Sequence, residues 1–115
     1  MIQAGEICMA EVPDLGVRPV IVVSRESLNR GYYAVVVPCT SSRFDSRKSL
    51  PNCVPFYTGD FGLFTNCVAQ CENISAIEHN QLNTEAGPIG KLDEDTMQKV
   101  VRAIGYVMEA DCEPV

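Results

Sequence analysis

The chain has 115 residues, of which 46% are hydrophobic, and a formal net charge of −6. This length suits a single domain over residues 1–115 with an apolar core, and no apolar run approaches the roughly 18 residues that a membrane span needs. The N-terminus has no charged start followed by an apolar region, so we expect a cytoplasmic protein without a signal peptide or a membrane partner.

The first part of the chain predicts three strands. Residues 5–12 alternate in part between apolar and polar side chains, and residues 13–16, "PDLG", have turn chemistry. Residues 18–24 and 32–38 are continuous β-branched runs, which are typical of strands buried on both faces. We expect the polar segment between these two runs to form a loop or a helical turn.

The middle of the chain alternates between polar and apolar segments. Residues 40–52 are polar and basic and predict a long loop. Residues 53–57 predict a short strand, in which Pro55 indicates a sheet edge because proline cannot donate to a ladder. After a turn at 59–62, residues 64–78 predict one long strand or two strands linked by a bulge.

A helix closes the chain. Asp93 is a favourable N-cap residue, and Glu94 and Asp95 follow in the first turn, where the helix dipole favours anions. Apolar side chains then recur at spacings of three and four, at Met97, Val100, Val101, Ile104, Val107 and Met108. Short strands followed by one helix predict a mainly β fold, a small SH3-like barrel of five to seven strands with a C-terminal α-helix.

The cysteines and the histidine give no metal-binding pattern. Cys8, Cys39, Cys67 and Cys71 lie in or beside apolar runs, where we expect them to be buried as small apolar groups. Only Cys67 and Cys71 are close in sequence, and the single histidine, His79, lies in a polar stretch that we expect at the surface. The spacing therefore predicts no metal site, and nothing else in the chain indicates a cofactor.

The basic residues are concentrated in one part of the chain. Six of the nine lysine and arginine residues lie between positions 18 and 48. A local basic field attracts phosphate even on an acidic protein. A solvated surface of mixed charge is the alternative, since most runs of charge are only that.

Two polar residues stand at the ends of the buried runs. Arg18 opens the first run and Thr40 follows the second, so antiparallel pairing of these strands would place both at the same end of the sheet. A guanidinium forks onto phosphate oxygens, and a hydroxyl donates to the same oxygens. The alternative is an arginine that snorkels off a strand start and a threonine that caps a loop.

Five segments resemble the MazF/PemK-like toxin family, in order and over nearly the whole chain. They are "GEI", "VRPVIVVS" with "LNRG", "VVVPCTSS", "ENISAIEHNQL" and "IGKLDEDTMQKVVRAI". The resemblance implies an SH3-like barrel that forms a homodimer. It also implies a sequence-selective, metal-independent endoribonuclease toxin of a type II toxin-antitoxin system, which inhibits growth by cutting single-stranded RNA or mRNA and is held off by a cognate antitoxin protein.

The resemblance also assigns roles to residues. The arginine of "VRPV", Arg18, would serve proton transfer and phosphate stabilisation, and the threonine of "PCTS", Thr40, would hold the phosphate. Ser41 matches the small polar residue that follows the threonine. We expect the remaining substrate contacts from the rim of this site and from the basic stretch, at Ser42, Arg43, Arg25 and Arg30.

The chain departs from the family pattern in places, and two alternatives stay open. Its first loop, "PDLGV", is short and acidic where the family often has a long basic loop, and Cys8 replaces the usual aromatic residue. One alternative is a catalytically degenerate member that only dimerises or binds a partner protein, for which Arg18 would be buried against a carboxylate. The other is a protein-binding module like the related gyrase-inhibiting toxins, which act through C-terminal residues, here "DCEPV".

Overall fold

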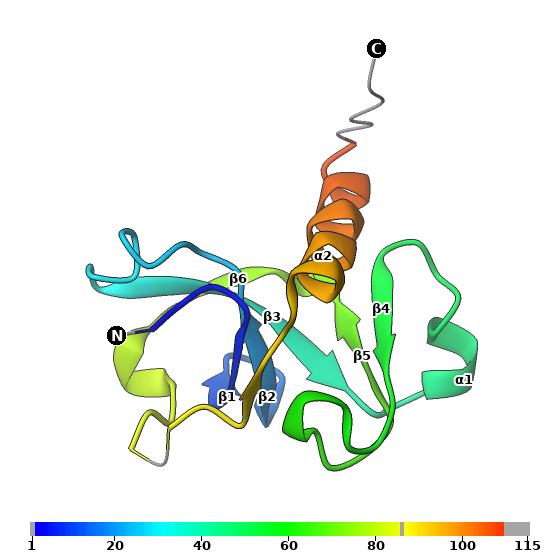
Figure 1. Ribbon diagram of the computed structural model, residues 1–115, viewed down its shortest axis with the longest axis horizontal. Coiled ribbons are helices and arrows are strands. Elements are labelled where there is room, and N and C mark those ends of the chain that lie inside the picture. Colours follow the sequence, from blue (N-terminus) through cyan, green and yellow to red (C-terminus); the bar gives the residue numbers. More distant parts are fainter. Residues whose placement is uncertain (1, 86, 110–115) are drawn as a thin grey trace.

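A curled antiparallel sheet and one long helix make up the protein. The computed structural model describes residues 2–85 and 87–109 (Figure 1). The elements in chain order are β1 (Glu6–Val12), β2 (Gly16–Val22), β3 (Tyr33–Thr40), α1 (Phe44–Arg47), β4 (Cys53–Phe56), η1 (Asp60–Gly62), β5 (Cys67–Gln70), η2 (Cys71–Asn73), β6 (Ser75–Glu78), η3 (His79–Gln81), β7 (Gly90–Lys91) and α2 (Glu94–Val107). The prediction of a mainly β fold with a C-terminal helix is confirmed.

The sheet is organised around β3. Its strands follow the order β4-β5-β3-β2-β1-β7, and β6 pairs with β3 outside that path. The first part of β3 pairs with β6 and β2, whereas its last two residues pair with β5, at Cys39↔Ala69 and Thr40↔Val68. Because β3 changes partners along its length, the sheet curls, and β3 crosses the molecule between its two halves (Figure 1).

The two β-branched runs are buried on both faces, as predicted. Ile21 and Val37 pack in one apolar cluster with Phe56 of β4 and Val100 of α2. The alternate residues of the same strands, Val20, Val22 and Val36, pack in a second cluster with Ile77 of β6. Two cores on opposite faces explain why these strands read as continuous apolar runs.

The helix and the buried cysteines also follow the prediction. The side chain of Asp93 accepts a hydrogen bond from the backbone N–H of Thr96 at 2.8 Å, which is the expected N-cap of α2. The four cysteines expected to be buried, Cys8, Cys39, Cys67 and Cys71, are buried, as is Cys53, and all five are free thiols. No helix within the described residues is long and apolar enough to cross a bilayer.

Two sequence predictions were wrong in detail, and one strand was missed. The segment 40–52 is not all loop, because α1 forms in its middle. The segment 64–78 is neither one strand nor a bulged pair: β5 starts only at Cys67 and is separated from β6 by η2. The two-residue strand β7 was missed, since it is defined only by its pairing with β1, at Glu6↔Lys91 and Ile7↔Gly90.

Candidate active site

The β2–β3 hairpin brings Arg18 and Thr40 to one end of the sheet. The two strands pair antiparallel, and the last pair of the ladder at this end is Val20↔Pro38. Arg18 and Thr40 each lie two residues beyond that pair, one on each strand. Together with Ser41 they line an open pocket of about 230 Å³. The prediction that Arg18 and Thr40 lie at the same end of the sheet is therefore confirmed.

Arg18 is held by the turn that precedes it. Its Nη2 donates a hydrogen bond to the backbone carbonyl of Leu15, in the turn between β1 and β2. That tight turn depends on Asp14 and Gly16, whose φ angles of 67° and 83° lie in the left-handed region. The Nε of Arg18 is buried and has no hydrogen-bond partner among the described residues. A buried donor of this kind is costly to the folded protein unless a partner satisfies it.

Thr40 is oriented by the backbone that follows it. Its Oγ1 accepts a hydrogen bond from the N–H of Ser42 at 3.2 Å, so its own proton stays available to donate to a ligand. The carbonyl of Ser42 in turn accepts a bond from Nη1 of Arg47 at 3.2 Å. Arg47, which the sequence did not single out, thus fixes the turn that carries Thr40 and Ser41.

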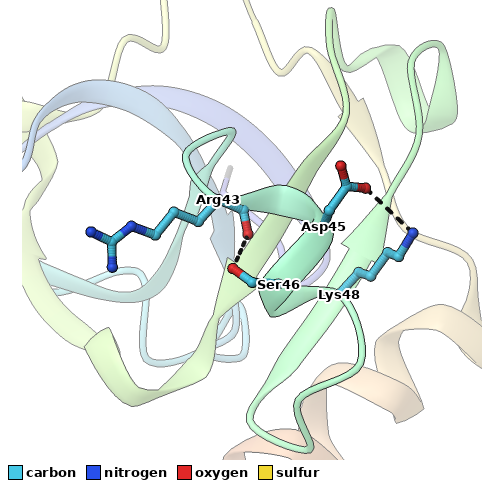
Figure 2. A network of polar contacts seen from close by, with 4 residues as sticks. All are labelled: Arg43, Asp45, Ser46 and Lys48. Carbon is cyan, nitrogen blue, oxygen red and sulfur yellow. Dashed lines mark hydrogen bonds and ion pairs between the residues drawn. The ribbon is translucent and has the colours of Figure 1, made fainter.

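Arg43 provides a cation near this turn. It occupies the N-cap position of α1 with a φ of 54°, and its carbonyl accepts a bond from Oγ of Ser46 at 3.1 Å. Figure 2 shows its guanidinium extending to the side opposite Asp45 and Lys48, which form an ion pair with each other at 3.4 Å. No ion pair within residues 2–85 and 87–109 involves Arg43, so its charge is available to a ligand.

Arg25 and Arg30 lie elsewhere. They belong to the loop that joins the other ends of β2 and β3, at the upper left of Figure 1. At about 3.3 Å per residue, β2 alone separates Arg18 from that loop by roughly 13 Å. The prediction grouped these arginines with the site because they are close in sequence, but a hairpin places residues seven and twelve positions apart at opposite ends.

His79 differs from the expected surface histidine. It is half-buried, and its Nε2 is buried without a hydrogen-bond partner among the described residues. It lines a second pocket of about 540 Å³, together with Glu6, Cys8 and Arg30. This larger pocket contains neither Arg18 nor Thr40.

Other residues line the Arg18 pocket without having been predicted. They are Met9, Val17, Pro19, Cys39, Leu63, Phe64, Thr65 and Cys67. The thiols of Cys39 and Cys67 are hydrogen-bonded to each other, which raises the pKa of Cys39 and lowers the pKa of Cys67. Residues 63–67 come from the segment before and at the start of β5, and sequence reasoning missed them because it had assigned most of that segment to a strand.

Comparisons with known proteins identify the family and the fold of the chain. The family model described as "PemK-like, MazF-like toxin of type II toxin-antitoxin system" matches residues 3–108. Among solved structures, "Mycobacterium tuberculosis toxin MazF-mt6" is 25% identical with a TM-score of 0.77, covering 92% of this chain and 98% of that chain. No curated protein matches the chain.

Two further solved structures share the fold at lower identity. "Endoribonuclease in complex with its cognate antitoxin from Mycobacterial species" is 22% identical, with a TM-score of 0.74 over 95% of this chain and 96% of that chain. "MazE-MazF (Form-II) from Deinococcus radiodurans" is 18% identical, with a TM-score of 0.71 over 93% of this chain and 94% of that chain.

Proposed function

The chain belongs to the PemK-like, MazF-like family of type II toxins, and from this premise we propose that it is a sequence-selective, metal-independent endoribonuclease that cuts single-stranded RNA. Its catalytic residues are Arg18 and Thr40, and Ser41, Ser42 and Arg43 contact the RNA backbone around them. Arg25 and Arg30 take no part in the same phosphate site within one subunit, because they lie at the other end of the hairpin.

The observation that carries the proposal is the unsatisfied Nε of Arg18. Arg18, which carries this buried donor, lines one pocket together with Thr40, whose proton is free to donate. A phosphate in the pocket would accept from both groups and would remove the cost of the unsatisfied donor. The degenerate alternative required Arg18 to be buried against a carboxylate, but its partner is the Leu15 carbonyl.

The chemistry follows from these two groups. The 2′-hydroxyl attacks the adjacent phosphorus, an O–P bond forms to that oxygen, and the bond from phosphorus to the 5′ oxygen breaks. Arg18 stays charged and stabilises the phosphorane, while the Thr40 hydroxyl holds a non-bridging oxygen. The 2′-hydroxyl gives its proton to water and the leaving 5′ oxygen takes one from water, while the Nε–H of Arg18, which has no acceptor among the described residues, donates a hydrogen bond to the leaving oxygen.

The surroundings of the site favour a single-stranded polyanion. Arg43 extends away from its acidic neighbour Asp45 (Figure 2). Arg47 is the last residue of α1, and Lys48 follows it. These cations attract phosphates along a strand that passes the pocket, despite the net charge of −6. The short turn between β1 and β2 leaves the pocket open instead of covering it.

The proposal includes two protein partners. One is a cognate antitoxin, since a solved neighbour with the same fold is an endoribonuclease bound to its antitoxin. The other is a second copy of the chain, for which α2 offers the exposed apolar side chains of Val101 and Tyr106. An enzyme that cuts mRNA would act in the cytoplasm.

Cleavage of an unstructured RNA by the purified protein tests the proposal. We expect cleavage that continues in EDTA, falls at least about 100-fold in Arg18→Ala, and is unchanged in Arg102→Ala, a matched loss of charge on the exposed face of α2. Expression in cells should arrest growth with the wild type only. Intact RNA in all samples would contradict the proposal, as would equal cleavage by Arg18→Ala.

A further inference from the structure

A large aromatic side chain is exposed at the candidate active site. Phe64 lines the pocket that contains Arg18 and Thr40, yet 72% of its surface is accessible. Phenylalanine is among the residues most often buried, and the chain places its other phenylalanines in partly or fully buried positions. An exposed ring beside the pocket proposed to bind phosphate offers a flat face to a ligand.

The backbone on both sides of Phe64 is fixed. Leu63 is buried, its N–H donates to the carbonyl of Asp60 at 2.9 Å, and its carbonyl accepts from the N–H of Gly59 at 2.8 Å. On the other side, Oδ1 of Asn66 accepts from the N–H and the hydroxyl of Thr58, at 2.9 and 3.1 Å. The ring is therefore presented from an ordered loop, which reduces the entropy lost when a ligand binds.

The loop that carries Phe64 packs against the backbone at β7 through two glycines, Gly62 and Gly90. A Cβ built on Gly90 would come within 1.9 Å of the Phe61 carbonyl oxygen, and one on Gly62 within 2.5 Å of the Ile89 carbonyl oxygen. The backbones of η1 and β7 thus touch directly, where no side chain fits. This contact holds the position of the loop relative to β1, the strand next to Arg18's strand.

We infer that Phe64 is a stacking platform for an unpaired nucleobase next to the phosphate held by Arg18 and Thr40. The inference rests on the proposed function and names its substrate class more closely. Aromatic side chains stack on every base, but only when the base is free to leave its helix. The platform therefore selects unpaired RNA, and its contribution to binding is roughly 5- to 150-fold.

Tryptophan fluorescence provides a direct test, because the chain contains no tryptophan. The probe is a single-stranded oligonucleotide made non-cleavable by a 2′-deoxy sugar at the mapped cleavage position. We expect it to quench Phe64→Trp, to leave Tyr32→Trp unchanged, and to bind Phe64→Ala about 5- to 150-fold more weakly than wild type. Tyr32, at 77% exposed, is the matched control at the other end of the hairpin.

A substrate with an abasic nucleotide beside the cleaved phosphodiester completes the test. We expect base removal to weaken binding to the wild type and to have no further effect in Phe64→Ala, as a double-mutant cycle requires of two groups in contact. Equal binding by Phe64→Ala, or RNA binding without quenching of Phe64→Trp, would overturn the inference and leave the proposed nuclease in place. RNA that is neither bound nor cut by the wild type would overturn both.

The test must also distinguish RNA binding at Phe64 from a contact between two copies of the chain. If Phe64 covered a contact between two copies of the chain, the emission of Phe64→Trp would shift with protein concentration in the absence of RNA. We expect no such shift, and observing it would overturn the assignment of the ring to RNA.

Discussion

The hydroxyl oxygen of Thr40 accepts a hydrogen bond from the backbone N–H of Ser42 at 3.2 Å. This contact fixes the rotamer of Thr40 at the pocket and leaves its hydroxyl proton as a donor. One hydroxyl therefore serves the structure through its oxygen and can serve a ligand through its proton.

Substitution of Thr40 should separate hydroxyl chemistry from shape. Thr40→Val keeps the shape and removes the hydroxyl, both as a donor to a ligand and as the acceptor from Ser42, so we expect RNA cleavage to fall about 10- to 1000-fold. Thr40→Ser keeps the hydroxyl and should retain most of the rate. Single-turnover cleavage measures both, and equal loss in the two variants would show that the hydroxyl is not the important group.

We expect Arg18 to lower the thermal stability of the folded protein while it supports RNA cleavage. Arg18→Met removes the buried Nε donor, which has no partner among the described residues, together with the hydrogen bond from Nη2 to the Leu15 carbonyl, and it keeps the length of the side chain. We expect a Tm unchanged or higher by a few degrees, together with at least about 100-fold slower cleavage. Thermal unfolding checks the first part. A Tm lower by several degrees would indicate that Arg18 is mainly a structural residue.

The contact between η1 and β7 should tolerate no side chain. Gly90→Ala places a methyl group against the Phe61 carbonyl, and we expect a loss of about 1–3 kcal/mol or more in the free energy of unfolding. Gly31→Ala is the matched control, since its Cβ would meet only the Leu28 carbonyl at 3.5 Å. Urea unfolding of the two variants compares them, and equal stability would contradict the close approach.

The N-cap of α2 should make stability depend on pH. The hydrogen bonds from Thr96 lower the pKa of Asp93 in the folded protein. Its contribution is therefore present above the unfolded pKa of about 3.9 and is lost as the pH falls through the lower, folded value. We expect Asp93→Asn to cap the helix without this dependence, so its Tm relative to wild type should rise between pH 5 and pH 3, measured by circular dichroism.

Patterns along the chain predicted the strands well, because a strand that is buried on both faces has apolar side chains at successive positions. The runs at β2 and β3 show this, and their antiparallel pairing is enough to bring Arg18 to Thr40. Charge clustering was less reliable. Arg25 and Arg30 share the basic stretch with Arg18 but lie at the other end of the hairpin, since closeness in sequence is not closeness in a sheet.

Features that depend on distant contacts were not predictable. Phe64 is presented by a loop that packs against β7, a strand that lies some 25 residues later in the chain. The half-buried state of His79 follows from packing that its polar sequence neighbours do not indicate. The role of "DCEPV", on which the gyrase-inhibitor alternative depends, lies outside the described residues.

One measurement tests the central claim most directly. It is the single-turnover cleavage of two otherwise identical RNAs, one of them with a 2′-deoxy sugar at the mapped cleavage position, by wild type and Arg18→Ala. Attack by the 2′-hydroxyl with charge stabilisation by Arg18 predicts that wild type cuts only the all-ribose RNA, leaving a 2′,3′-cyclic phosphate, and that Arg18→Ala is at least about 100-fold slower. Cleavage of the 2′-deoxy RNA, or an unchanged rate in Arg18→Ala, would contradict this mechanism.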